Sequence, residues 1–152
     1  MKQLICGGLA VLCGVSMLAR PLVAQPAVSD ATRQALTAAQ ALARDAGADI
    51  AAIGEAYARV FQCADLPIEQ RVQAHLELAQ CHAARGRYEA ASAAYDRGLA
   101  DGDLTTAQTL KLLNAQARMW FDSNFQGAFA SYFTRGIEQA AAVYRRIIEL
   151  PG

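Results

Sequence analysis

The sequence has little of what builds β-sheets, common enzyme sites or nucleic-acid surfaces. It contains no run of β-branched residues, no CxxC or HExxH spacing, no GxSxG elbow and no glycine-rich phosphate loop. Basic and acidic residues number 14 each in the 152-residue chain, so no basic field is available for nucleic acid or anionic lipid. We therefore expect a protein that is not an enzyme, uses no cofactor and does not bind nucleic acid.

The first 24 residues have the three-part layout of a secretory signal peptide. A basic start at Lys2 precedes an almost wholly apolar run over residues 4–19, and a polar segment containing Pro21 ends near Ala24. The apolar run is about 16 residues long, shorter than the roughly 20 that a membrane-spanning helix needs. We predict cleavage after Ala24 and export, to the periplasm or as a secreted protein. One domain over residues 25–152 remains, without membrane attachment.

Strong helix formers, alanine above all, dominate the rest of the chain and predict an all-α fold with at least five helices. Apolar residues recur at helical spacing on both sides of Gly86, which stands where a left-handed helix terminator belongs. Residues 68–99 therefore predict an antiparallel helical hairpin, whose first helix should bury one face at Ile68, Val72, Leu76, Ala79 and Ala83.

A period of 38 residues runs through the chain. Three segments share an aromatic residue followed two places later by arginine and then by an apolar residue: Glu55–Phe61, Ala93–Leu99 and Ser131–Ile137. The turns repeat as well, because Asp65–Leu66 recurs as Asp103–Leu104, and Gly86 corresponds to Asn124, another residue that tolerates a left-handed turn. We predict three hairpin units near residues 30–65, 66–103 and 104–150, the third opening with a capping box of Thr105 and Gln108. The tail of the third unit is expected to form a capping helical segment.

This repeat resembles the tetratricopeptide repeat, and the middle unit carries the resemblance best. Leu78–Ala79, Gly86 with Tyr88, Ala91 and Tyr95 match the family pattern, whereas His75 stands where the family prefers tryptophan and Asp103 where it prefers proline. The resemblance implies an α-solenoid of about three stacked hairpins with a concave surface lined by the first helix of each.

The resemblance also implies that a partner binds on the concave surface. Counted across the matched units, that surface should include Leu76 and Ala83 together with the partner-binding candidates Gln73, Gln80, Lys111, Asn114, Arg118 and Phe121. Lysine and arginine on either side of an amide suit a carboxylate, and an aromatic ring beside them suits an apolar group. The competing interpretation is that these residues form an ordinary solvated helix face and bind no partner.

Other candidate sites have simpler structural explanations. His75, Cys81 and His82 resemble a metal set, but Cys81 is about 100° around the helix from His82, so packing explains the three residues better. Three arginines follow the repeated aromatic residues and are expected to have structural or solvated roles, as long polar side chains that can lie across a neighbouring helix: Arg59, Arg97 and Arg135.

Export favours a disulfide between Cys63 and Cys81, the two cysteines that remain after cleavage. The predicted helices oppose it, because Cys81 lies about 20 Å along the helix that follows Cys63, and a disulfide needs α-carbons within about 7 Å. We expect no disulfide, a buried Cys81 and a more accessible Cys63.

These observations predict an exported, non-catalytic module that binds a protein or peptide, one with an acidic or carboxylate-bearing segment, in the concave groove of a helical-repeat stack. Three alternatives stay open. The chain could be an assembly module of the envelope that acts through its helix ends, or the N-terminal part of a longer repeat array. It could also be a metal-binding or enzymatic domain that uses His75, Cys81 and His82.

Overall fold

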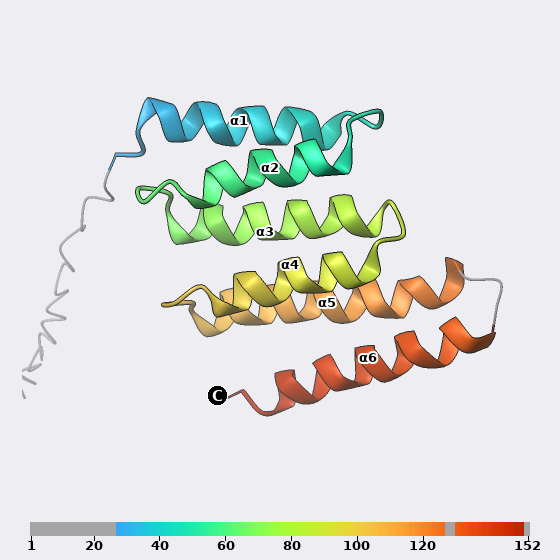
Figure 1. Cartoon of the computed structure of the whole chain (residues 1–152). Coiled ribbons are helices and arrows are strands. Elements are labelled where there is room, and N and C mark those ends of the chain that lie inside the picture. Colours follow the sequence, from blue (N-terminus) through green and yellow to red (C-terminus); the bar gives the residue numbers. More distant parts are fainter. Residues whose placement is uncertain (1–26, 127–129, 151–152) are drawn as a thin grey trace, which may run out of the picture.

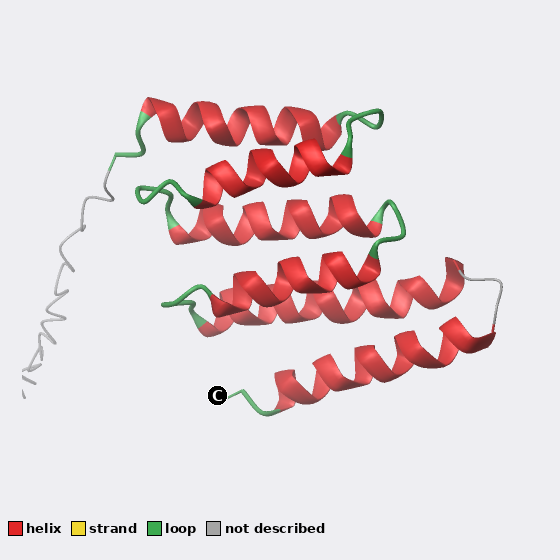
Figure 2. Cartoon of the chain, in the orientation of Figure 1, coloured by secondary structure: helices red, strands yellow, loops and turns green. Residues whose placement is uncertain are grey.

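The part of the chain that the structure describes folds into six α-helices. The computed structural model describes residues 27–126 and 130–150, and this part of the chain contains no strand, as the sequence predicts (Figure 2). The helices are α1 (Asp30–Arg44), α2 (Ile50–Phe61), α3 (Ile68–Ala83), α4 (Tyr88–Ala100), α5 (Thr106–Gln126) and α6 (Ala130–Ile148). No described helix combines the length and apolar character needed to cross a membrane. The predicted signal peptide, residues 1–24, lies outside the described residues.

The helices pack as three adjacent pairs, α1 with α2, α3 with α4 and α5 with α6 (Figure 1). The first helices of the pairs also contact one another, α1 with α3 and α3 with α5. Helix α3 thus contacts α1, α2, α4 and α5, and it buries Ala74, His75, Leu78 and Cys81 in addition to the predicted positions Val72, Leu76 and Ala79. The expectation of a single buried face was too narrow, because a central helix has neighbours on several sides.

The middle hairpin follows the prediction closely. Gly86 adopts the left-handed conformation, with φ of 69°, in the turn between α3 and α4. Gly98 of α4 is also buried, and a β-carbon added there would lie 3.0 Å from the β-carbon of His75 on α3. The absence of a side chain at Gly98 therefore lets these two helices approach closely.

Polar side chains define where several helices begin. In the predicted capping box, the backbone N–H of Thr105 donates to Gln108 Oε1 at 2.9 Å, and the Gln108 N–H donates to Thr105 Oγ1 at 3.2 Å. At the start of α1, Asp65 accepts hydrogen bonds from the Ser29 N–H at 2.7 Å and from the Thr32 hydroxyl at 2.5 Å. These bonds lower the pKa of Asp65 to about 2 and hold the first helix to the loop that precedes α3.

The repeated aromatic and arginine residues differ in burial. Tyr57 and Tyr95 are almost completely buried in the second helices of the first two pairs, whereas the side chain of Phe133 lies outside the described part. The three arginines are exposed, as predicted: Arg59, Arg97 and Arg135.

The third pair departs from the 38-residue period. Helix α5 continues through Asn124 to Gln126, so the prediction of a left-handed turn at Asn124 was wrong. Ion pairs place Arg135 beside Glu89 and Arg146 beside Asp96, separations of 46 and 50 residues. Because α5 is longer than predicted, the turn after it comes later in the sequence, and α6 is shifted along α4. The predicted second helix of unit three and the predicted capping segment are consequently one helix, α6.

Candidate functional site

The helices α1, α3 and α5 lie side by side in a constant register that polar side chains mark. Gln40 Nε2 donates to Glu77 at 3.2 Å and Lys111 Nζ donates to Gln73 Oε1 at 3.3 Å, across separations of 37 and 38 residues. Gln108 Nε2 donates to Glu69 Oε2 at 2.9 Å across 39 residues. The sequence period thus reappears as sideways contacts between corresponding turns of neighbouring helices.

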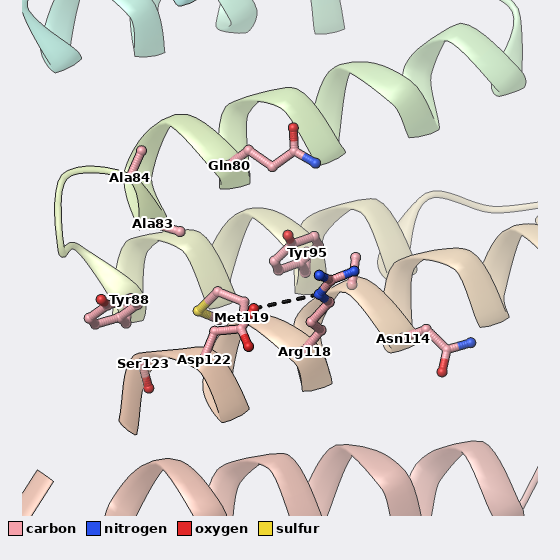
Figure 3. A pocket seen from close by; sticks show the side chains of 11 residues that line it. Gln80, Ala83, Ala84, Tyr88, Tyr95, Asn114, Arg118, Met119, Asp122 and Ser123 are labelled. Carbon is pink, nitrogen blue, oxygen red and sulfur yellow. Dashed lines mark ion pairs between the residues drawn. The ribbon is translucent and has the colours of Figure 1, made fainter. Parts of the chain in front are cut away.

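A hollow of about 540 Å³ opens between α3 and α5, beside α4. Figure 3 shows Gln80 and Ala83 on α3, Ala84 directly after it, Tyr88 and Tyr95 on α4, and the α5 residues Asn114, Arg118, Met119, Asp122 and Ser123. Met119 and the small alanines give the hollow an apolar floor, and amide, hydroxyl and charged groups stand around it. We call it the α3–α5 hollow.

A second hollow of about 310 Å³ lies between α1 and α3. It is lined by Gln40, Ala43, Arg44, Glu77, Gln80, Cys81, Ala84 and Arg85. Gln80 and Ala84 line both hollows, so the two form one track across α1, α3 and α5. We call this track the two-hollow groove.

Three of the six predicted partner-binding residues, Gln80, Asn114 and Arg118, line this groove. The side chains of all six are exposed, but Gln73 and Lys111 lie together outside the hollows, with Lys111 Nζ 3.8 Å from Glu69 Oε1. Phe121 is 49% exposed and does not line either hollow. Leu76, which was expected on this surface, is buried because it faces the neighbouring helices. Ala83, expected there as well, does line the groove.

One ion pair lines the α3–α5 hollow. Arg118 Nε lies 3.5 Å from Asp122 Oδ2, four residues along α5, and the Arg118 side chain is 83% exposed. Such an exposed pair is worth at most about 1 kcal/mol, so a ligand carboxylate can displace Asp122 at little cost. Lys111 is held by Glu69 and Gln73 away from the groove. Of the two cations expected to bind one ligand, Lys111 and Arg118, only Arg118 therefore lines the groove.

Glu77 is a groove residue that the sequence reasoning missed. Its carboxylate accepts hydrogen bonds from Gln40, from Gln73 Nε2 at 3.2 Å and from the Tyr57 hydroxyl at 2.8 Å, so it joins α1, α2 and α3. Burial, followed by the bond to Glu77, raises the pKa of Tyr57. Applying the 38-residue spacing backward from Gln80 leads to Leu42 of α1. Gln40 and Arg44 are two residues away, on another side of that helix, so the period did not indicate them. Asp122 could have been found from its i, i+4 spacing to Arg118.

The structure does not bring His75, Cys81 and His82 together. His75 is buried, stacks on Phe61 with ring centres 4.1 Å apart, and has its Nε2 atom 3.1 Å from Asp101 Oδ2. Burial lowers the pKa of His75, and Asp101 opposes the effect. The Cys81 thiol donates instead to the carbonyl of Ala43 on α1 at 3.8 Å. Among the described residues, no group of three or more histidine, cysteine, aspartate or glutamate side chains could hold a metal ion.

The cysteines have the predicted burial. Cys81 is buried and Cys63 is half-buried, and both are free thiols in this structure. Burial raises the pKa of Cys81. The Cys63 thiol, in the loop just after α2, donates to the carbonyl of Arg59 near the end of α2 at 3.4 Å, so the two sulfur atoms have different neighbours.

The geometry of this groove suits a ligand that offers a small apolar group, hydrogen-bonding amides and one carboxylate. Comparison of the chain with protein-family models, curated proteins and solved structures finds no match.

Proposed function

We propose that this protein is an exported, non-catalytic binding module that holds an extended segment of a partner protein in the two-hollow groove. The observation that carries the proposal is the continuity of the two hollows at Gln80 and Ala84. An extended peptide has side chains alternating along its length, and two adjoining hollows can take two of them.

The proposal includes the architecture, a solenoid of the tetratricopeptide type. Three helix pairs, sideways contacts between α1, α3 and α5, and the left-handed Gly86 fit such a stack. In a solenoid, the first helices line the concave surface, which is where the two-hollow groove would then lie.

The chemistry of the groove favours a particular ligand. The apolar floor of the α3–α5 hollow, with Met119 and Ala83, suits an aliphatic or aromatic side chain. Gln80 and Asn114 can donate to and accept from a peptide backbone. Arg118 can bind a carboxylate, either an acidic side chain or a chain terminus, in place of Asp122.

A peptide-display selection on the purified protein tests the proposal. Random peptides that bind the wild-type protein are measured by fluorescence anisotropy against Ala84→Trp, which fills the junction of both hollows. Ala100→Trp is the matched control, because Ala100 is also an exposed alanine at the end of a helix but lies outside both hollows. We expect Ala84→Trp to weaken binding at least about tenfold and Ala100→Trp to leave it unchanged.

The carboxylate contact is tested with a second pair of variants. Arg118→Glu should weaken the binding of acidic peptides about 10- to 100-fold, the range for a lost charge-assisted hydrogen bond. Arg97→Glu reverses an exposed arginine of α4 that lines neither hollow and should have no effect. Peptides that bind Ala84→Trp as tightly as the wild-type protein would show that the groove is not the binding site.

A further inference from the structure

Helix α6 uses two of its sides within the fold. Ala140 and Val143 are buried toward the core, and α6 packs on α5. Arg135 and Arg146 reach the neighbouring helix α4, where they pair with Glu89 at 3.4 Å and with Asp96 at 3.2 Å. The last helix is thus anchored on α5 by apolar contacts and on α4 by ion pairs.

A third side of α6 carries an apolar stripe that nothing in the described structure covers. Its large members Ile137, Tyr144 and Ile148 are 43%, 47% and 82% exposed, and Ala141 lies between them. These four residues stand at i, i+4, i+7 and i+11, the spacing of a coiled-coil seam. In Figure 1, α6 is the outermost helix at its end of the stack, and the exposed fractions show that the stripe lies at the surface.

Two charges run along one edge of this stripe. Glu138 and Arg145 each follow a stripe residue by one position, and both are exposed. They are seven residues apart, about 10 Å along the axis, which is too far for an ion pair within the helix. Neither belongs to an ion pair in the described part of the chain. Arg135 and Arg146, on another side of the same helix, are both paired.

We propose that two copies of this protein pair through α6, with the two helices antiparallel. In this arrangement Ile137 lies opposite Ile148 of the second copy, and Ala141 lies opposite Tyr144 of the second copy, a small residue against a large one. Glu138 then faces Arg145 of the second copy, and the two-fold axis repeats that contact. A parallel arrangement would place like residues level with one another and would not bring these two charges together.

The two-fold geometry makes a closed dimer and not a filament, since each stripe is used once. The opposite edge of the stripe carries no comparable charge, because Ala140 and Ile147 occupy it and pack on the molecule's own core. One helix from each copy makes a small interface. We therefore expect dissociation in the micromolar range, as for other small interfaces. The dimer is independent of the two-hollow groove, since no groove residue belongs to α6.

Sedimentation velocity of the full chain, with its N-terminus first identified by intact mass, tests the proposal. We expect the sedimentation coefficient to rise from monomer to dimer between about 1 and about 200 µM. Ile148→Ser should abolish the rise. Glu138→Arg and Arg145→Glu should each weaken dimerisation at least about tenfold, because each variant places like charges opposite one another.

Mixing the two charge variants gives the decisive measurement. An equimolar mixture of Glu138→Arg and Arg145→Glu should form a heterodimer, because two cations on one copy then face two carboxylates on the other. This recovery also shows that both variants are folded. Glu55→Arg reverses an exposed charge on α2 and should dimerise like the wild-type protein. A wild-type chain that stays monomeric at about 200 µM, a mixture that fails to associate, or single variants that associate undiminished would each overturn the proposal.

Discussion

Gly98 of α4 lies so close to His75 of α3 that a single added methyl group should destabilise the protein. A β-carbon at position 98 would lie 3.0 Å from the His75 β-carbon and 3.1 Å from its Cγ atom. The imidazole cannot easily move away, because it stacks on Phe61 at 4.1 Å and binds Asp101. Overpacking of this kind costs about 1–3 kcal/mol. Alanine in place of glycine inside a helix stabilises the folded state by about 0.5–1 kcal/mol, which offsets part of this cost. Gly98→Ala should therefore lower the free energy of unfolding by up to about 2.5 kcal/mol.

Gly54 of α2 provides the matched control. It is also a helical glycine, and a β-carbon added there meets nothing within 4 Å, so Gly54→Ala should stabilise the protein by about 0.5–1 kcal/mol. The helix-propensity gain is common to both variants. The difference between them therefore isolates the steric cost of about 1–3 kcal/mol. Urea unfolding followed by far-UV circular dichroism measures both values. If Gly98→Ala proves as stable as Gly54→Ala, α3 and α4 are not packed as closely at His75 as the structure indicates.

Three further predictions follow from the buried and hydrogen-bonded groups. Burial lowers the pKa of His75 and of His82, so the unfolded chain binds protons more readily. The free energy of unfolding should change little between about pH 7 and 8 and fall as the pH drops through about 6.5. His75→Gln should make this fall shallower in urea unfolding at each pH, and an unchanged fall would contradict its assignment to His75. For Asp65, an NMR titration should give a pKa of about 2, and Thr32→Val should raise this pKa toward 3.8. A pKa already near 3.8 in the wild-type protein would mean that Asp65 does not bind the start of α1. A thiol titration of the folded, non-reduced chain that begins at Gln25 should detect two thiols, Cys63 before Cys81. A Cys63–Cys81 cross-link in a proteolytic digest would show that the relation between α2 and α3 is different.

The candidate site illustrates how far a repeat pattern can be followed. The period identified α3 and α5 as neighbours, and Gln80, Asn114 and Arg118 do share one hollow. It could not show that Lys111 is engaged by Glu69 and Gln73, since ion pairs between helices depend on side-chain reach. Nor could it indicate that Glu77 joins three helices, because a lone glutamate in a helix has no distinctive spacing.

The sequence by itself determined the local structure. Alanine-rich segments with apolar residues at helical spacing can form little except amphipathic helices, and Gly86, Thr105 and Gln108 specify a turn and a helix start through their own backbone and hydrogen-bonding chemistry. The 38-residue period also predicted which helices lie side by side, because equal units that pack alike repeat their contacts at the same interval.

Only the tertiary structure decided how the third helix pair is built. Asn124 tolerates a left-handed turn but does not require one, so α5 continues past it to Gln126, and α6 shifts along α4 to where Arg135 and Arg146 meet Glu89 and Asp96. Helical spacing alone does not distinguish the apolar residues of α6 that are buried, such as Val143, from those that are exposed, such as Ile148. That choice depends on where the neighbouring helices lie, which no local pattern contains.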